Sequence, residues 1–311
     1  MAEPRIVELT ARQGGERLDK FLAAGLQGVS RTEIQRLIKE AQVLVNGREA
    51  RPSYRLEAGD VVCVALPLRP DDVVRPQDIP LEVLYEDADL VAVNKPPGMV
   101  VHPAQGSRED TLVNAALWRW PEMAAVGGPD RAGVVHRLDK ETSGVILLAR
   151  TPAALAALQA QFKARTTTKQ YLALVEGIPV SRAGVIEAPI GRDPRQRKRM
   201  AVVHEGRPSV TRYDVIEVFD EHALLAVEPK TGRTHQIRVH LAWLGHPVVG
   251  DRVYGFRRQR LKIGRMFLHA AALEVVSPST GERLRFEAPL PPDLADVLSR
   301  LRGTRADQWV E

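Results

Sequence analysis

The sequence predicts an α+β protein with a small N-terminal unit and a larger domain built on a large mixed sheet. Two helical patterns followed by short strand patterns indicate the small unit, and a proline-rich stretch separates it from the rest of the chain. After that stretch, several strand-like segments are interspersed with three helical ones. With 311 residues, 44% of them hydrophobic, the chain is long enough for both units to bury a core.

The small unit is predicted to begin with two helices. In ERLDKFLAAG, Leu18 and Leu22 stand at helical spacing, and Gly25 ends the pattern. Ser30 and Glu33 then form an S-x-x-E capping pattern before a second apolar stripe. We therefore expect two helices at this end of the chain.

Two strand patterns complete the small unit, namely VLVNGREA with its Asn46-Gly47 turn and VVCVAL after the Gly59-Asp60 turn. The predicted helices concentrate basic side chains, which suits contact with a phosphate backbone, although such charges also keep an ordinary surface solvated. These residues are Arg17, Lys20, Arg31, Arg36 and Lys39.

The segment PLRPDDVVRPQDIP, residues 67–80, holds four prolines and little periodicity, so we expect an extended linker there. The larger domain is predicted over residues 81–302. Its strand patterns include LEVLYED, DLVAVNKP, YLALVEG, SVTRYDVIEVFD and HALLAVEP. Its helices are expected in DTLVNAALWRW, begun by Asp110, in TPAALAALQAQFKAR, capped by Thr151, and in THQIRVHLAWLG.

Composition excludes several classes of protein. The formal charge of +5 and the pI near 9.5 permit a polyanionic partner. The single cysteine, Cys63, rules out disulfides within the chain and a cysteine-based zinc site. The sequence lacks a P-loop, a G-x-G-x-x-G pattern and H-E-x-x-H. No apolar run approaches a membrane span and the N-terminus lacks a signal-peptide core, so we expect a cytoplasmic protein that does not bind membranes.

The stretch GVVHRLDKETSGVILLAR, residues 133–150, places a charged group between two apolar, strand-like segments. Asp139 therefore lies in a loop at a strand end, where a rigid sheet usually presents catalytic groups. A surface turn with a salt bridge would produce the same pattern. The residues alone leave both interpretations open.

The same stretch resembles the signature of the RluA family of pseudouridine synthases. Three further segments are similar to that family's motifs, in the expected order: VAVNKPPGMVVHP, KQYLALVEG and GRTHQIRVHLAWLGHPVVGD. Residues 16–66 resemble the S4 RNA-binding domain. Together these resemblances cover nearly the whole chain, and the order of S4-like domain, linker and catalytic domain is similar to that of the family's enzymes for the large ribosomal subunit.

The resemblance implies a pseudouridine synthase fold with a mostly antiparallel sheet, and an enzyme that isomerises specific uridines of 23S ribosomal RNA. Such an enzyme breaks the C1′–N1 glycosidic bond and rejoins the uracil through C5, so no cofactor or metal is expected. The partner would be large-subunit ribosomal RNA, free or within pre-ribosomal particles, and the protein is expected to be a monomer.

The resemblance also implies roles for individual residues. Asp139 would be the nucleophile, either attacking the ribose or uracil covalently or promoting a glycal intermediate. Arg233 would be the adjacent guanidinium that keeps this carboxylate ionised, and Tyr171 would lie against the flipped uracil. The RNA-contacting residues expected near the nucleophile are Arg137, which would fill the gap left by the flipped base, and His136. Leu138 and Leu241 would form the wall of the uracil pocket.

Two alternatives remain open from the sequence. A non-catalytic RNA-binding assembly factor could use the S4-like unit, but it would not need Asp139, Tyr171 and Arg233 together. A nucleoside glycosylase would need a positioned water and a second carboxylate. The arginine-rich run RDPRQRKRM, residues 192–200, is either a solvated loop or an RNA-binding segment.

Overall fold

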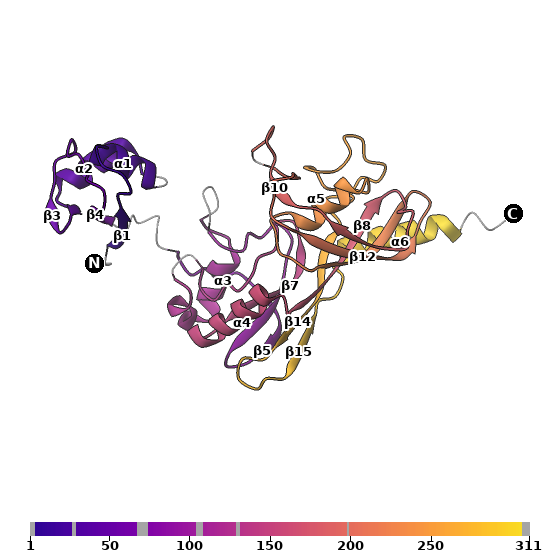
Figure 1. The fold of residues 1–311 in the computed structure, drawn as a ribbon. Helices are drawn as coiled ribbons and strands as arrows, with labels where there is room; N and C mark the ends of the chain where they lie inside the picture. Colours follow the sequence, from indigo (N-terminus) through magenta and orange to yellow (C-terminus); the bar gives the residue numbers. More distant parts are fainter. Residues whose placement is uncertain are drawn as a thin grey trace. The chain divides into compact units, whose positions relative to one another are not determined.

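The computed structural model describes residues 4–26, 29–66, 74–103, 108–128, 131–197 and 199–306. The chain divides into two compact units, residues 1–73 and residues 74–311 (Figure 1). Each unit has its own hydrophobic core. In the described part, no helix is both long enough and apolar enough to cross a lipid bilayer.

The small unit packs two helices on a four-stranded antiparallel sheet with the strand order β1-β4-β2-β3. Strand β1 lies before Glu16, so the unit begins earlier in the chain than its predicted boundary. This strand was missed because its partner β4 is more than fifty residues away. The elements are β1 (Arg5–Thr10), α1 (Leu18–Gly25), α2 (Arg31–Lys39), β2 (Val43–Val45), β3 (Arg48–Glu49) and β4 (Val61–Leu66).

The two helices form where the sequence pattern places them. Ser30 caps α2, since its Oγ accepts a hydrogen bond of 3.2 Å from the Glu33 N–H. Leu18, Leu22 and Ile34 are at most 1% exposed and pack on the sheet. The basic side chains therefore lie on the remaining helix surface.

The larger unit is built on a nine-stranded sheet with the order β5-β6-β7-β14-β8-β13-β12-β9, and β15 pairs with β14. Only the β7–β14 pair is parallel among the described pairs, which confirms the predicted mixed, mostly antiparallel sheet. The strands are β5 (Glu82–Glu86), β6 (Leu90–Lys95), β7 (Ser143–Ala149), β8 (Thr168–Glu176), β9 (Ala183–Glu187), β12 (Val210–Val218), β13 (His222–Pro229), β14 (Leu268–Val276) and β15 (Arg283–Glu287). A separate hairpin pairs β10 (Ile190–Arg192) with β11 (Met200–Val202).

Helices cover both faces of this sheet, as shown by the alternation of core residues along a strand. On β8, Ala173 and Val175 pack in a core with α5, whereas Leu174 packs in a core with α6. On β7, Ile146 packs in the core of α3, and Leu147 in that of α4. The helices are α3 (Leu112–Arg119), a 3₁₀ turn (Pro121–Ala125), α4 (Pro152–Ala164), α5 (Gln236–Trp243) and α6 (Pro292–Ala306).

Helix α3 begins one residue later than predicted. Its N-cap is Thr111 rather than Asp110, because the Thr111 Oγ1 accepts a bond from the Asn114 N–H and the Asn114 side chain accepts one from the Thr111 N–H. This reciprocal pair satisfies donors at the start of the helix.

The second half of the predicted linker belongs to the larger unit. Residues 67–73 lie outside the described part, and residues 74–80, although irregular, pack on the larger unit. Val74 and Ile79 join the core of α3, and the Asn114 side chain donates to the carbonyl of Arg75 at 2.7 Å. The larger unit therefore begins near Val74 instead of residue 81.

The start of β7 approaches β14 very closely. Gly144 has φ +114°, and a Cβ atom there would lie 2.2 Å from the Ala270 carbonyl oxygen. Only glycine fits this point. The loop that carries Asp139 leads directly into this junction, at the centre of the sheet.

Candidate active site

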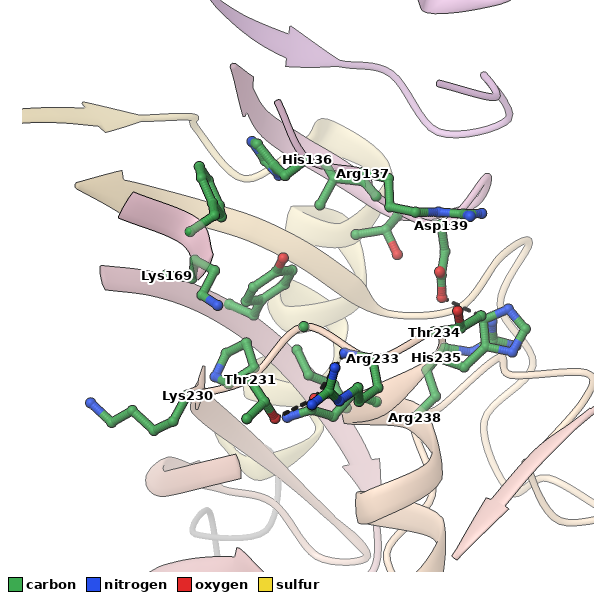
Figure 2. Close-up of a pocket in the computed structure, with 18 of the residues that line it drawn as sticks. His136, Arg137, Asp139, Lys169, Lys230, Thr231, Arg233, Thr234, His235 and Arg238 are labelled. Carbon is green, nitrogen blue, oxygen red and sulfur yellow. Dashed lines mark hydrogen bonds and ion pairs between the residues drawn. The ribbon is translucent and has the colours of Figure 1, made fainter. Parts of the chain in front are cut away.

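A cavity of about 530 Å³ lies on the sheet face that α3 and α5 cover (Figure 2). Tyr171 lines this cavity, and its side chain packs against both the hydrophobic core of α3 and that of α5. Asp139, Tyr171 and Arg233, which lie far apart in the sequence, all line this cavity. An adjoining cavity of about 590 Å³ shares Asp139 but not Tyr171.

Asp139 belongs to a tight turn before β7. The Thr142 N–H donates to the Asp139 carbonyl at 3.1 Å. The next residue, Lys140, is anchored from the end of β6, because its carbonyl accepts bonds from the Gly98 N–H and from Nζ of the buried Lys95. These bonds fix the backbone of the turn that carries the Asp139 side chain.

Arg238, and not Arg233, is the guanidinium that contacts Asp139. Its Nη1 donates to Asp139 Oδ2 at 3.0 Å (Figure 2), and its Nε and Nη2 donate to both carboxylate oxygens of Asp251 at 2.6 and 3.0 Å. Arg238 is 7% exposed and Asp251 is 2% exposed. Burial alone would lower the pKa of Arg238, but the hydrogen bond to Asp251 and the two carboxylate charges raise it overall.

The expected pairing of Asp139 with Arg233 is thus wrong in this structure. Arg233 lies in the loop before α5, where its Nη2 donates to the Pro208 carbonyl at 3.3 Å. The buried Gln236 holds this loop, since its Oε1 accepts from the Arg233 N–H and the Thr231 hydroxyl. Arg233 therefore lines the cavity as a cation without contacting the carboxylate.

Sequence reasoning missed Arg238 and Asp251 although both stand in a quoted motif. The available signal was an arginine within the apolar helix IRVHL, because a charged side chain on a buried helix needs a partner. Asp251, the last residue of the same motif, supplies that partner.

Tyr171 keeps its proton at neutral pH. Burial, followed by the charge of Asp139, raises the pKa of this phenol above its ordinary value. Tyr171 can therefore offer a ring face and a hydroxyl donor to a planar substrate.

His136 lines the cavity and is held by the backbone of β7. Its Nε2 accepts a hydrogen bond of 3.0 Å from the Leu147 N–H, and its ring stacks on Phe162 with centroids 4.7 Å apart. Burial lowers its pKa to about 3, and the charge of Lys169 acts in the same direction. A contact of His136 with RNA stays a prediction, and it would be made by a neutral ring rather than by a cation.

The two leucines differ in position. Leu138 is 5% exposed and lines the cavity, as expected for a pocket wall. Leu241 is fully buried in the core of α5 and lines neither cavity. Its helical position turns it toward β8 and β13, so the prediction for Leu241 is wrong.

Cationic side chains surround the carboxylate. Arg137 is exposed and borders both cavities. Lys169 and Lys230 lie on the side of the cavity away from Asp139 (Figure 2). Burial lowers the pKa of Lys169 to about 8, although the charge of Glu228 opposes this effect. Positive charge on both sides of the cavity suits a phosphodiester strand.

In the small unit, Arg17, Lys20 and Arg31 border a hollow of about 260 Å³. Arg17 also pairs with Asp19 at 2.9 Å. Arg36 is held by Glu33 and Glu40, at 2.8 and 3.2 Å, so its charge is already matched within α2. Lys39 lies in the last turn of the same helix.

Among the described residues, no three His, Cys, Asp or Glu side chains gather closely enough to hold a metal ion. The cavity is lined by the anchored carboxylate of Asp139, the phenol of Tyr171 and several cationic side chains.

Comparison with known proteins identifies the family of this chain. Residues 89–243 match the family model described as RNA pseudouridylate synthase, and residues 16–62 match the S4 domain model. An uncharacterized RNA pseudouridine synthase from Chloroflexus aurantiacus is 50% identical, over 97% of this chain and 95% of the relative. The ribosomal large subunit pseudouridine synthase D of Xanthomonas campestris is 46% identical, over 94% of this chain and 91% of the relative.

A solved structure shows the same fold. The human RNA pseudouridylate synthase domain containing 1 superimposes with a TM-score of 0.59 at 29% identity, covering 73% of this chain and 96% of its own. The resemblance indicated by the sequence motifs is thereby confirmed.

Proposed function

Because the chain belongs to the RNA pseudouridylate synthase family, we propose that it converts specific uridines of 23S ribosomal RNA to pseudouridine with Asp139 as the nucleophile. The observation that carries this proposal is the anchored carboxylate of Asp139, held by Arg238 at 3.0 Å in a cavity that Tyr171 also lines. The large-subunit substrate is supported by relatives named as ribosomal large subunit enzymes.

The reaction needs an ionised carboxylate directed at the ribose or at the uracil. Arg238 supplies a fixed positive charge beside Asp139 and is itself held by Asp251, so little reorganisation is needed when the substrate binds. The C1′–N1 bond breaks, the uracil turns within the pocket, and C5 bonds to C1′ while its proton leaves and N1 gains one. Reactant and product have the same atoms, so the reaction consumes no co-reactant.

The remaining residues bind and orient the substrate. Tyr171 and Leu138 provide surfaces for the planar base. A paired uridine must leave its stack to reach this cavity, at a cost of a few kcal/mol. Arg137, exposed at the border of both cavities, is placed to contact the bases or phosphates that the uridine leaves behind.

The test is to map pseudouridine in 23S ribosomal RNA from a strain that lacks this gene, and then to add purified protein to that RNA. We expect positions that lose pseudouridine in the deletion strain to regain it with wild-type protein and not with Asp139→Asn. Binding of the RNA without any new pseudouridine would instead support the non-catalytic assembly factor.

A further inference from the structure

The β10–β11 hairpin carries a group of arginines that the proposed reaction does not use. We call residues 190–202 the arginine hairpin; it contains Arg192, Arg195, Arg197 and Arg199. Within the described residues, none of these arginines pairs with a carboxylate. The carboxylate of Asp193 accepts the backbone N–H groups of residues 195 and 196 and shapes the turn. The hairpin therefore presents positive charge suited to RNA phosphates.

Tyr254 joins this hairpin to the active site through its hydroxyl group. The Met200 N–H of β11 donates to the Tyr254 oxygen at 3.0 Å, and His235 Nδ1 lies 2.8 Å from the same oxygen. The Met200 N–H donates to the phenol oxygen, and the tautomer of His235 decides whether Nδ1 accepts the phenol proton or donates to the same oxygen. Burial lowers the pKa of His235.

The aromatic ring of Tyr254 also connects the arginine hairpin to the active site, through cation–π contacts with Arg199 and Arg238. The guanidinium carbon of Arg199 lies 5.0 Å from the ring centroid, and that of Arg238 also lies 5.0 Å from it. The Nε atom of Arg199 is buried without a hydrogen-bond partner, which fits a stacked guanidinium. One aromatic ring thus contacts a cation of the arginine hairpin and the cation that holds Asp139. Strand β11 contacts α5, the helix that carries Arg238.

We propose that Tyr254 is a positioning residue that links RNA seated on the arginine hairpin to the Asp139–Arg238 pair. This inference rests on the proposed function. An RNA phosphate bound by Arg199 holds its guanidinium against the Tyr254 ring, and the ring in turn stays in contact with Arg238. Arg238 then keeps its place between the ring, Asp251 and Asp139. Contacts from Arg199 to Tyr254 and from Tyr254 to Arg238 thereby couple RNA binding on the hairpin to the orientation of Asp139.

The experiment is a double-mutant cycle of Arg199→Gln and Tyr254→Met, read as the single-turnover rate at saturating enzyme and, separately, as RNA affinity. Methionine fills space without an aromatic face. We expect Arg199→Gln to lower the saturating rate about tenfold in the wild-type background, as loss of one desolvated cation–π contact allows. In the Tyr254→Met background the same substitution should leave the already reduced rate nearly unchanged.

Tyr254→Phe provides the conservative comparison, because it keeps both ring contacts and loses only the two hydroxyl bonds. We expect its rate to lie between those of the wild type and Tyr254→Met. Arg283→Gln, at an exposed position on β15, is the control and should match the wild type in rate and affinity.

The proposal is overturned if Arg199→Gln weakens RNA binding but leaves the saturating rate at the wild-type value. That result needs no Tyr254 variant, so it decides the matter even if Tyr254→Met does not fold. Equal losses from Arg199→Gln in both backgrounds would also overturn it. Absence of pseudouridine with the wild-type protein would reject the proposed function itself, and this inference with it.

Discussion

Asp139 acquires its chemical character from residues that are distant in the sequence. Arg238 and Asp251 form a buried, bidentate pair whose remaining guanidinium donor reaches Asp139. Bidentate geometry is specific to arginine, and a lysine at position 238 could not hold both carboxylates in the same way. The arrangement keeps an anion fixed inside a cavity that otherwise carries positive charge.

The first prediction concerns the nucleophile. Asp139→Asn should lower the isomerisation rate by at least about 10³-fold, because the amide keeps the shape of the side chain but cannot act as a nucleophile. RNA affinity should stay within about threefold, since the basic surface is unchanged. Single-turnover assays and filter binding measure the two quantities, and Asp214→Asn on β12 is a matched surface control. A rate near the wild-type value would remove Asp139 from the mechanism.

The second prediction separates the two arginines. Arg238→Gln should lower the saturating rate at least about 100-fold and destabilise the fold by about 3 to 5 kcal/mol, because the buried Asp251 loses its partner. Arg233→Gln should chiefly weaken RNA binding, since the contact of Asp139 with Arg238 remains. Rates and thermal unfolding of both variants are to be compared. If Arg233→Gln caused the larger loss of rate, Arg233 would be the functional partner in the RNA complex.

At the scale of elements, the loop that carries Asp139 is tied to the end of β6. Lys95 is fully buried, and its Nζ donates to the carbonyls of Pro96, Met99 and Lys140 at 2.7, 2.9 and 3.1 Å. Two turns that are separated by forty residues therefore share one side chain. Their relative position determines where Asp139 enters the cavity.

The third prediction uses the titration of this lysine. Burial lowers the pKa of Lys95 from 10.5 to about 7, and the charge of Glu141 opposes that effect. Between about pH 7 and pH 10.5, the Lys95 amine is therefore mostly protonated in the unfolded chain and mostly neutral in the folded protein. The free energy of unfolding is therefore highest above about pH 10.5 and decreases as the pH falls to about 7, because protonation of Lys95 then favours the unfolded chain.

Lys95→Met should abolish this dependence. The free energy of unfolding of the wild type, relative to the variant, should rise by up to about 1.4 kcal/mol per pH unit between pH 7 and pH 9. Denaturant titrations at several pH values measure it. A difference that stays constant with pH would show that the Lys95 pKa is not lowered.

At the scale of the whole molecule, the chain forms two units with separate cores. We expect the small unit to contribute to RNA binding and the larger one to carry the chemistry. The basic residues of the small unit are not equivalent. Lys20 and Arg31 border the hollow, whereas Arg36 is already paired within its own helix.

The fourth prediction follows from that difference. Replacing Lys20 and Arg31 together with Gln should weaken RNA binding and reduce the slope of log affinity against log salt by about 0.7 to 0.9 for each lost phosphate contact. Arg36→Gln should have a smaller effect. The single-turnover rate at saturating enzyme should remain. A rate that falls as steeply as affinity would contradict the division between the two units.

Local sequence patterns were sufficient for most elements. Capping residues such as Ser30 and Thr151 placed helices, and apolar runs such as VILLA placed strands buried on both faces. Strand β1 and the packing of residues 74–80 could not be predicted in this way, because both depend on partners remote in the sequence.

Motifs and short-range periodicity were enough to predict the family, the division into two units and the position of Asp139 at a strand end. The arginine that faces this carboxylate could be identified only from tertiary contacts. Arg233 and Arg238 stand five residues apart in one motif, and the choice depends on where α5 begins and on the buried Asp251 that fixes Arg238. The same reason applies to Leu241, which packs in the core, and to His136, whose Nε2 is occupied by a backbone N–H of β7. Such contacts join distant segments, and no local pattern encodes them.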